Sequence, residues 1–369
     1  MTNITSVPAE LLSVVFDNIE SNLQLAECRL VCRKWNDPAA RSMLGNKITI
    51  NSEKAASRLF RHLFLDPSKI PLIRHLDFRL DEDNLPMNVY KLLLLTFTPS
   101  IVNLTGSVKS KRFFTALFDI VNTSPQTFAN LATLPLYSGS DADFNTTVAL
   151  KFKDSLLYPT LRLSGQTTQT TKDFLKDLDQ FQNLGMVILR GHVNGLEWME
   201  DLLKSNSDLE GFGVINFEFK GFRPILTRTG GMDSWLASSV QQEKALQYLM
   251  ISSVCRPEVL EYFSYKYPEL KYIELKGRVW LPERGLPTES DVFTTVDRIL
   301  NVVKKIECKV ISLVLPRNAS LMAAIKYVSG REEDIEFSIA DFRGETEVIL
   351  NLTNVTDEIP TDGFLQLFY

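Results

Sequence analysis

Histidine is scarce in this chain, and the sequence motifs of the common catalytic sites are missing. The 369 residues include three histidines, His62, His75 and His192, which lie far apart in the sequence. The chain has no Gly-x-x-x-x-Gly-Lys-Ser/Thr phosphate loop, no Gly-x-Ser-x-Gly nucleophile elbow and no His-Glu-x-x-His zinc helix. We therefore expect a protein that is not an enzyme and that uses no cofactor. An enzyme with a cryptic site in an α/β region is the alternative.

Cysteines and long apolar runs are also few. The four cysteines, Cys28, Cys32, Cys255 and Cys308, suggest no disulfide framework, which fits a reducing compartment. Cys28 and Cys32 have the i, i+4 spacing of two metal ligands, but no histidine cluster accompanies them, so we expect no metal site. The most apolar run, Leu92–Phe97, is too short to cross a bilayer, and the first residues do not have the pattern of a signal peptide. We expect a cytoplasmic or nuclear location, or both, and no membrane partner.

Basic charge is not in excess either. The net charge is −5 at pH 7, which argues against nucleic acid as the main partner, because phosphate binding needs a basic face. Residues 331–369 hold ten acidic and two basic side chains, a net charge of −8, and we expect them to form an acidic, solvated C-terminal cap. A length of 369 residues exceeds what one compact core usually organises, and it predicts two domains or an elongated architecture.

The first part of the chain is predicted to fold into short amphipathic helices. Pro8 suits the first turn of a helix, and Asp37-Pro38 predicts the N-cap and first turn of another. Apolar residues recur in helical stripes between them, at Leu12, Val15, Phe16 and Ile19 and again at Leu25, Cys28 and Cys32. Three helices in under 50 residues cannot enclose so many large side chains alone. Surplus apolar surface of this kind usually belongs to a partner.

The order of these residues resembles an F-box, the helical module that docks onto the Skp-type adaptor of cullin-based ubiquitin ligases. The motifs that carry the resemblance are Val7-Pro8, Glu10-Leu11-Leu12, Phe16 and Leu30-Val31-Cys32-Arg33-Lys34-Trp35. The resemblance implies a three-helix F-box over residues 1–45 that binds the adaptor and, through it, cullin. The adaptor-binding residues that it implies are Pro8, Leu11, Leu12, Phe16, Ile19, Leu30, Val31 and Trp35.

The chain departs from the F-box pattern in two places. Val7 stands where family members usually have leucine, and the loop Ser21-Asn22-Leu23-Gln24 lacks the acidic residue often found there. The alternative to an F-box is a helical cap on the N-terminal end of a larger core, which would also be amphipathic. Such a cap gives no reason for these residue types to occur in this order.

A strand pattern recurs from about residue 70. It consists of an apolar residue, any two residues, a second apolar residue, any one residue and a third apolar residue. The central residues of the clear and weaker copies are Leu76, Leu104, Leu134, Leu161, Val187, Phe212, Leu249, Ile273, Leu313 and Phe337. Seven of the nine steps between them are 24 to 30 residues long, and segments with helical periodicity, such as 113–121 and 292–303, lie between the strands.

One strand and one helix per 24 to 30 residues resembles leucine-rich repeats of an irregular type. We therefore expect an α/β fold in which the F-box is followed by a curved solenoid, with parallel strands on the concave face and helices on the convex face. A linking helical segment over residues 46–69 precedes the solenoid, which covers residues 70–369 including the acidic cap. An ordinary α/β domain, which also alternates strand and helix, is the alternative, and Pro135 argues against a strand at its position.

Side chains next to the motif residues should point to the concave surface, because side chains alternate along a strand. The residues placed there are Asp77, Arg79, Tyr137, Arg162, Ile188, Arg190, Met250, Glu274 and Lys276. The two longest steps predict loops near residues 220–242 and 276–291, which contain Trp235 and Trp280. As candidate substrate-binding residues we select Arg79, Arg162, Arg190, Lys276, Trp235 and Trp280. The plain alternative for each tryptophan is that it fastens its loop to the solenoid.

The resemblance to an F-box protein therefore implies a non-catalytic subunit that selects a protein substrate for an SCF-type E3 ubiquitin ligase. Four basic residues against two acidic ones on the concave surface give a weak preference for an acidic or phosphorylated target. The alternative is a binding scaffold that uses its F-box for adaptor docking without driving degradation. The sequence does not identify the substrate.

Overall fold

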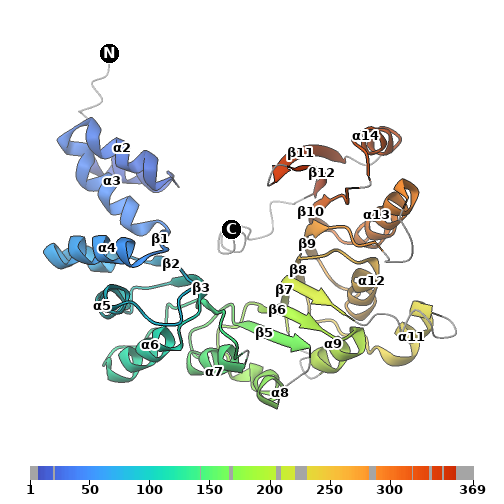
Figure 1. Ribbon diagram of the computed structural model, residues 1–369, viewed down its shortest axis with the longest axis horizontal. Helices are drawn as coiled ribbons and strands as arrows, with labels where there is room; N and C mark the ends of the chain where they lie inside the picture. Colours follow the sequence, from blue (N-terminus) through green and yellow to red (C-terminus); the bar gives the residue numbers. More distant parts are fainter. Residues whose placement is uncertain are drawn as a thin grey trace. The chain divides into compact units, whose positions relative to one another are not determined.

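The computed structural model describes residues 7–19, 21–141, 143–165, 169–204, 209–220, 231–281, 288–317, 319–331, 335–342 and 345–354. The chain divides into two compact units. The first unit comprises Met1–Pro159 with Gln180–Asn183, and the second comprises Thr160–Asp179 with Leu184–Tyr369. Figure 1 shows the elements of both units with their labels.

The first unit begins with three helices, α1 (Ala9–Asp17), α2 (Asn22–Val31) and α3 (Arg33–Gly45). Pro8 is the N-cap of α1, and the hydroxyl of Ser21 caps α2 by accepting a hydrogen bond from the Gln24 N–H at 3.3 Å. Cys32 is extended and separates α2 from α3. The prediction that a helix starts at Asp37-Pro38 is wrong, because α3 begins at Arg33 and contains Pro38 in its interior.

A four-stranded parallel sheet follows, with the strands in the order β1-β2-β3-β4. Its elements are β1 (Ile48–Ile50), α4 (Glu53–Leu65), the 3-10 helix Pro67–Leu72, β2 (His75–Leu80), α5 (Met87–Thr96), β3 (Asn103–Val108), α6 (Lys111–Thr123), β4 (Leu136–Tyr137) and α7 (Asp143–Lys151). Helices α4, α5 and α6 cover one face of the sheet (Figure 1). Phe78 on β2 packs edge-on against Phe113 on α6, with ring centres 4.9 Å apart. The predicted linking segment 46–69 thus contains a strand as well as a helix.

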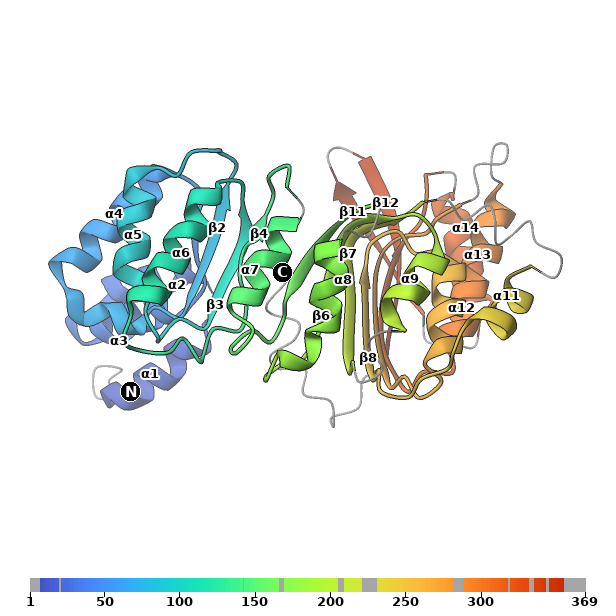
Figure 2. The same cartoon turned by 90° about the horizontal axis from the view of Figure 1, so that it is seen from below.

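The second unit contains an eight-stranded sheet in the order β11-β12-β10-β9-β8-β7-β6-β5. Its elements are β5 (Thr160–Gly165), α8 (Gln169–Lys176), β6 (Val187–Val193), α9 (Leu196–Leu203), β7 (Gly211–Phe219), α11 (Gly231–Ser239), β8 (Tyr248–Ser252), α12 (Pro257–Lys266), β9 (Tyr272–Arg278), α13 (Glu289–Val303), β10 (Cys308–Val314), α14 (Leu321–Ser329), β11 (Glu336–Phe342) and β12 (Glu345–Asn354). A short 3-10 helix (Leu178–Gln180) follows α8. Strands β5 to β10 are parallel neighbours in chain order, and α9, α12 and α13 lie along one face of them (Figure 2).

The strand register aligns some of the residues at the centre of the predicted strand pattern. Leu76 pairs with Leu104, and Val187, Phe212, Leu249 and Ile273 form a continuous row of partners across β6 to β9. The row breaks at β10, where Lys309 rather than Leu313 pairs with Ile273.

Three other copies of the pattern also differ from the prediction. Leu161 pairs with Leu189, two residues beyond Val187, and Leu134 lies just before the short strand β4. Phe337 belongs to a strand that runs antiparallel to β12, so β11 and β12 form an antiparallel pair at the end of the sheet. The observed fold is therefore mixed α/β, with parallel strands joined by helices and an antiparallel pair at the C-terminal end.

Candidate functional site

The three N-terminal helices enclose a small apolar interior of their own. Leu12, Phe16, Leu25 and Ala39 are buried together, and the Phe16 ring is 1 % exposed and meets Trp35 edge-on with ring centres 5.2 Å apart. The prediction that Leu12 and Phe16 contact an adaptor needs correction, because both side chains face α2 and α3 and fill the centre of the bundle. Around this interior lie the partly buried side chains Val7, Ile19, Cys28, Trp35 and Met43.

A second set of apolar side chains in the bundle is exposed. These residues are Leu11, Val14, Val15, Leu23, Leu30 and Val31. On α1 they have i, i+3, i+4 spacing, and on α2 Leu23 and Leu30 have i, i+7 spacing, so each helix carries one apolar stripe directed to solvent. Leu30 is 86 % exposed. Four of the predicted adaptor-binding residues, Pro8, Leu11, Leu30 and Val31, are therefore accessible to a partner.

Trp35 stands between the interior and the surface. Its ring is half-buried beside Phe16, while the indole Nε1 is buried and makes no hydrogen bond. Buried indole N–H groups usually find an acceptor. Trp35 is thus chiefly a packing residue of the bundle, and its accessible edge is the part that a partner can contact.

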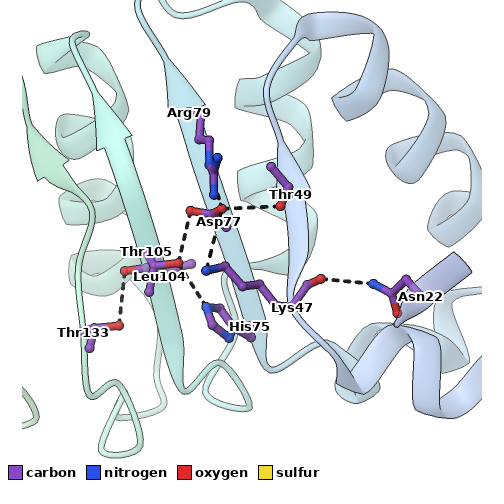
Figure 3. A network of polar contacts seen from close by, with 9 residues as sticks. All are labelled: Asn22, Lys47, Thr49, His75, Asp77, Arg79, Leu104, Thr105 and Thr133. Atoms are coloured by element: carbon purple, nitrogen blue, oxygen red, sulfur yellow. Dashed lines mark hydrogen bonds and ion pairs between the residues drawn. The ribbon is translucent and has the colours of Figure 1, made fainter. Parts of the chain in front are cut away.

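The bundle is fastened to the start of the first sheet by side-chain amides. Asn22 Nδ2 donates to the Lys47 carbonyl at 3.0 Å, and Asn46 Nδ2 donates to the Ile19 carbonyl at 2.9 Å. The bond between Asn22 and Lys47 lies next to a polar cluster on the strands, of which Lys47 is a member (Figure 3).

The centre of that cluster is Asp77 on β2, which is 2 % exposed. Leu76, Phe78 and Leu80 face the helices, so Asp77 lies on the opposite face of the sheet. Its Oδ2 accepts a hydrogen bond from Arg79 Nε at 3.0 Å and lies 4.0 Å from Lys47 Nζ.

Two threonine hydroxyls and one histidine complete the cluster. Thr49 Oγ1 lies 3.4 Å from Oδ2 of Asp77, and Thr105 Oγ1 donates to Oδ1 at 3.3 Å. His75 Nε2 lies 3.0 Å from Thr105 Oγ1. Since the single Thr105 proton goes to the carboxylate, the His75 ring must donate from Nε2.

Burial and, to a smaller extent, the nearby Lys47 ammonium lower the pKa of His75 to about 4, against the opposing effect of Asp77. The ring is therefore neutral near pH 7, which agrees with its role as a donor to Thr105. The cluster combines one carboxylate with two cations. It holds Arg79, whose side chain is mostly exposed, in a fixed position on this face, and it suits recognition of a polar or acidic group better than acid–base catalysis.

Gly106 makes room for the cluster. Its φ is +95°, and a Cβ at this position would lie 2.7 Å from Asp77 Oδ1 and 2.1 Å from the Phe78 carbonyl oxygen. Only glycine adopts this backbone conformation readily and allows such a close approach. The burial of Asp77 and the need for Gly106 were not predicted from the sequence.

The other predicted substrate-binding residues lie in the second unit and are not all exposed. Arg162 and Arg190 are partners in the β5–β6 register and lie side by side on one face, and burial lowers the pKa of Arg190. Lys276 forms an ion pair with Glu274 at 2.8 Å. The expectation of an open surface is wrong at several positions, since the buried residues there include Asp77, Tyr137, Ile188, Met250 and Glu274.

The two tryptophans selected from the predicted loops are held by neighbours. Trp235 is buried in α11 and packs against Tyr262 with ring centres 5.8 Å apart. The prediction that it contacts a substrate is therefore wrong, and Trp235 instead holds its own segment against α12. Trp280 is half-buried, and the Arg256 guanidinium lies over its ring at 4.0 Å. Residues 221–230 and 282–287 of the two predicted loops lie outside the described residues.

A buried ionic cluster in the second unit was not predicted from the sequence. Lys266 on α12 is fully buried and lies 3.1 Å from Glu200 and 3.0 Å from Glu243. Tyr262 donates to Glu200 Oε2 at 2.8 Å. The sequence feature that could have indicated this cluster is a lysine among the aromatic residues of 259–267. The partners of Lys266, however, are 66 and 23 residues away in the chain. The cluster ties α9 and the segment before β8 to α12.

A cavity of about 420 Å³ lies near β12. Its lining includes Arg278, Arg317 and Thr346, and Arg278 forms an ion pair with Glu347 there. Within the described ranges no group of three or more His, Cys, Asp or Glu side chains is arranged to hold a metal.

A search of those same ranges for membrane-spanning segments found no helix that is both long and apolar enough. Comparison of the sequence with models of known protein families gave no match, and a search of curated proteins gave none either.

Proposed function

We propose that this protein is the substrate-recognition subunit of an SCF-type E3 ubiquitin ligase. It docks onto a Skp-type adaptor through an F-box at residues 1–45, and it holds a protein target on a leucine-rich-repeat-like solenoid. The observation that carries the proposal is the surplus of apolar side chains on α1 and α2. The bundle already has a filled interior, yet Leu11, Leu30 and Val31 remain exposed.

The energetic reason for a partner follows from these residues. Burying one leucine or valine side chain that is otherwise exposed contributes about 1.5–3 kcal/mol. Several such residues on two short helices therefore supply enough free energy for a specific interface. In a free chain the same residues would only add to the apolar surface in water.

The strand order supports a repeat architecture for the rest of the chain. Strands adjacent in sequence are adjacent in each sheet from β1 to β4 and from β5 to β10, and register partners in the first sheet, such as Ile48, Leu76 and Leu104, are 28 residues apart. A doubly wound α/β domain instead changes direction within its sheet and carries helices on both faces. Sequential parallel strands with helices on one face are typical of a solenoid.

The experiment is a binding titration between the full chain and a purified Skp-type adaptor. Leu30→Glu should weaken binding at least tenfold, or about 1.4 kcal/mol, because it places a charge where an apolar contact is expected. Leu65→Glu is the matched control, since Leu65 is a similarly exposed leucine on α4. Circular dichroism of both variants shows whether the helices are intact.

Binding of the Leu30→Glu variant with the affinity of the unaltered chain would contradict the docking surface. Absence of any binding by the unaltered chain would contradict the F-box itself. The half-life of captured target proteins, with and without residues 1–45, then distinguishes a degradation subunit from a scaffold that only docks.

A further inference from the structure

The eight-stranded sheet of the second unit ends in β11. Among the strands that the structure describes, β11 pairs with β12 alone. Its seven residues, Glu336–Phe342, pair with Asn351–Glu345 without a register shift. One side of β11 therefore presents a row of backbone N–H and C=O groups that can continue the sheet.

Proteins usually protect such an edge with proline, charged side chains (lysine above all), a bulge or a very short strand. β11 has no proline, lysine or bulge and is seven residues long, and its charged residues are Glu336 and Asp341. Two large apolar side chains also project from it, Phe337 at 39 % and Ile339 at 53 % exposure. They lie two residues apart and pair with the buried residues Leu350 and Val348, so the apolar face of this strand pair continues to the edge of the sheet.

The charge of this region indicates which kind of strand can be added. Residues 335–342 contain Glu336 and Asp341 and no basic residue. Two copies of the chain joined edge to edge would bring two acidic strands together, which is unfavourable for like charges. A basic segment has the opposite charge and is attracted.

We propose that β11 is a binding site for an extended peptide segment in which apolar residues alternate with lysine or arginine. The added strand extends the sheet through backbone hydrogen bonds. Its apolar side chains pack beside Phe337 and Ile339, and its basic side chains lie on the opposite face beside Glu336. This site does not depend on the proposed ligase function, because it is formed by the second unit alone.

The probe is a fluorescein-labelled peptide of the repeating sequence Lys-Val-Arg-Ile, titrated with the full chain and followed by fluorescence anisotropy. The double variant Phe337→Ser with Ile339→Thr should weaken binding at least tenfold, because it removes the apolar contacts without changing the charge. Glu336→Gln should weaken it to a smaller extent and reduce its dependence on salt. Leu65→Ser, on the first unit, is the matched control and should leave the affinity unchanged.

Two peptide controls separate strand addition from simple charge attraction. Replacing alternate residues by N-methylated ones removes backbone donors and should abolish binding, and an acidic version, Glu-Val-Asp-Ile, should not bind. The proposal is overturned if the Lys-Val-Arg-Ile peptide fails to bind, or if the double variant binds it as well as the unaltered chain does. Sedimentation that reveals a dimer lost in the double variant would assign the edge to a second copy and also overturn the proposal. Loss of adaptor binding, by contrast, would affect only the proposed ligase function.

Discussion

Lys266 is the buried cation that neutralises two glutamates in the second unit, and its replacement by methionine tests how much that unit depends on it. The ammonium lies 3.1 Å from Glu200 and 3.0 Å from Glu243, and it also donates to the Gln241 carbonyl at 3.2 Å. Methionine fills a similar volume but leaves two buried carboxylates without their cation. Breaking a buried ion pair in this way costs about 3–5 kcal/mol of folding free energy.

The two glutamates differ in the hydrogen bonds that remain when Lys266 is replaced. Glu200 keeps hydrogen bonds from the Tyr262 hydroxyl and from the Gln241 N–H, whereas Oε2 of Glu243 has no partner among the described residues. Adding Glu243→Gln to Lys266→Met removes the less satisfied charge. The double variant should therefore recover at least about 1 kcal/mol, a coupling expected only for side chains in contact.

Tryptophan fluorescence during urea unfolding provides the measurement. Trp35 belongs to the first unit, whereas Trp198, Trp235 and Trp280 belong to the second, so a Trp35→Phe background makes the signal specific for the second unit. Lys244→Met is the control, because the Lys244–Glu269 ion pair is exposed to solvent, and its unfolding midpoint should not move. A midpoint for Lys266→Met equal to that of this control, or a double variant no more stable than the single one, would refute the reasoning.

Three further predictions concern the first unit. His75 has a pKa of about 4 in the folded chain against 6.5 when unfolded. Its neutral form therefore stabilises the fold above pH 6.5, and up to about 3 kcal/mol of the unfolding free energy is lost as the pH falls to 4. His75→Gln should flatten this part of the curve of unfolding free energy against pH, whereas His62→Gln, at an exposed ring, should change it less. Gly106→Ala should lower the unfolding free energy by at least about 2 kcal/mol, measured by urea unfolding, because the new methyl would meet the Phe78 carbonyl; an unchanged midpoint would contradict the assigned conformation. Phe16→Ala should lower the unfolding free energy by about 3–5 kcal/mol and reduce the helical circular dichroism signal. Loss of adaptor affinity without any change in stability would instead make Phe16 a contact residue.

The sequence predicted the alternation of strands and helices well, because apolar spacing depends directly on which side chains are buried. The row Val187, Phe212, Leu249 and Ile273 aligned as expected. The failure at β10 has a definite cause. Ile311, Leu313 and Leu315 alternate along the strand and are all buried, so a shift by an even number of residues leaves the same side chains facing the helices. Apolar periodicity alone cannot distinguish these registers.

The candidate site was harder to predict, because residues beside the motif positions were assigned to the open surface from the alternation of side chains along a strand. Asp77 and Glu274 are buried, although the cations that they bind, Arg79 and Lys276, remain partly exposed, and these two contacts join residues two apart in the sequence. The antiparallel pair of β11 and β12 was missed for a related reason. The repeated pattern predicts a series of parallel strands, but the alternation of side chains in 345–354 fits an antiparallel strand equally well.

The N-terminal helices show why an apolar stripe does not by itself identify a docking surface. Leu12 and Phe16 have helical spacing, as do Leu11 and Val15, yet the first pair fills the bundle and the second is exposed. An adaptor that required direct contact with Phe16 would have to open the bundle, and removing so large an aromatic side chain from a core costs about 3–5 kcal/mol. Docking through the stripes that are already exposed needs no such opening. The affinity for an adaptor should therefore depend on Leu30 and Leu11, and the stability of the bundle on Phe16 and Leu12.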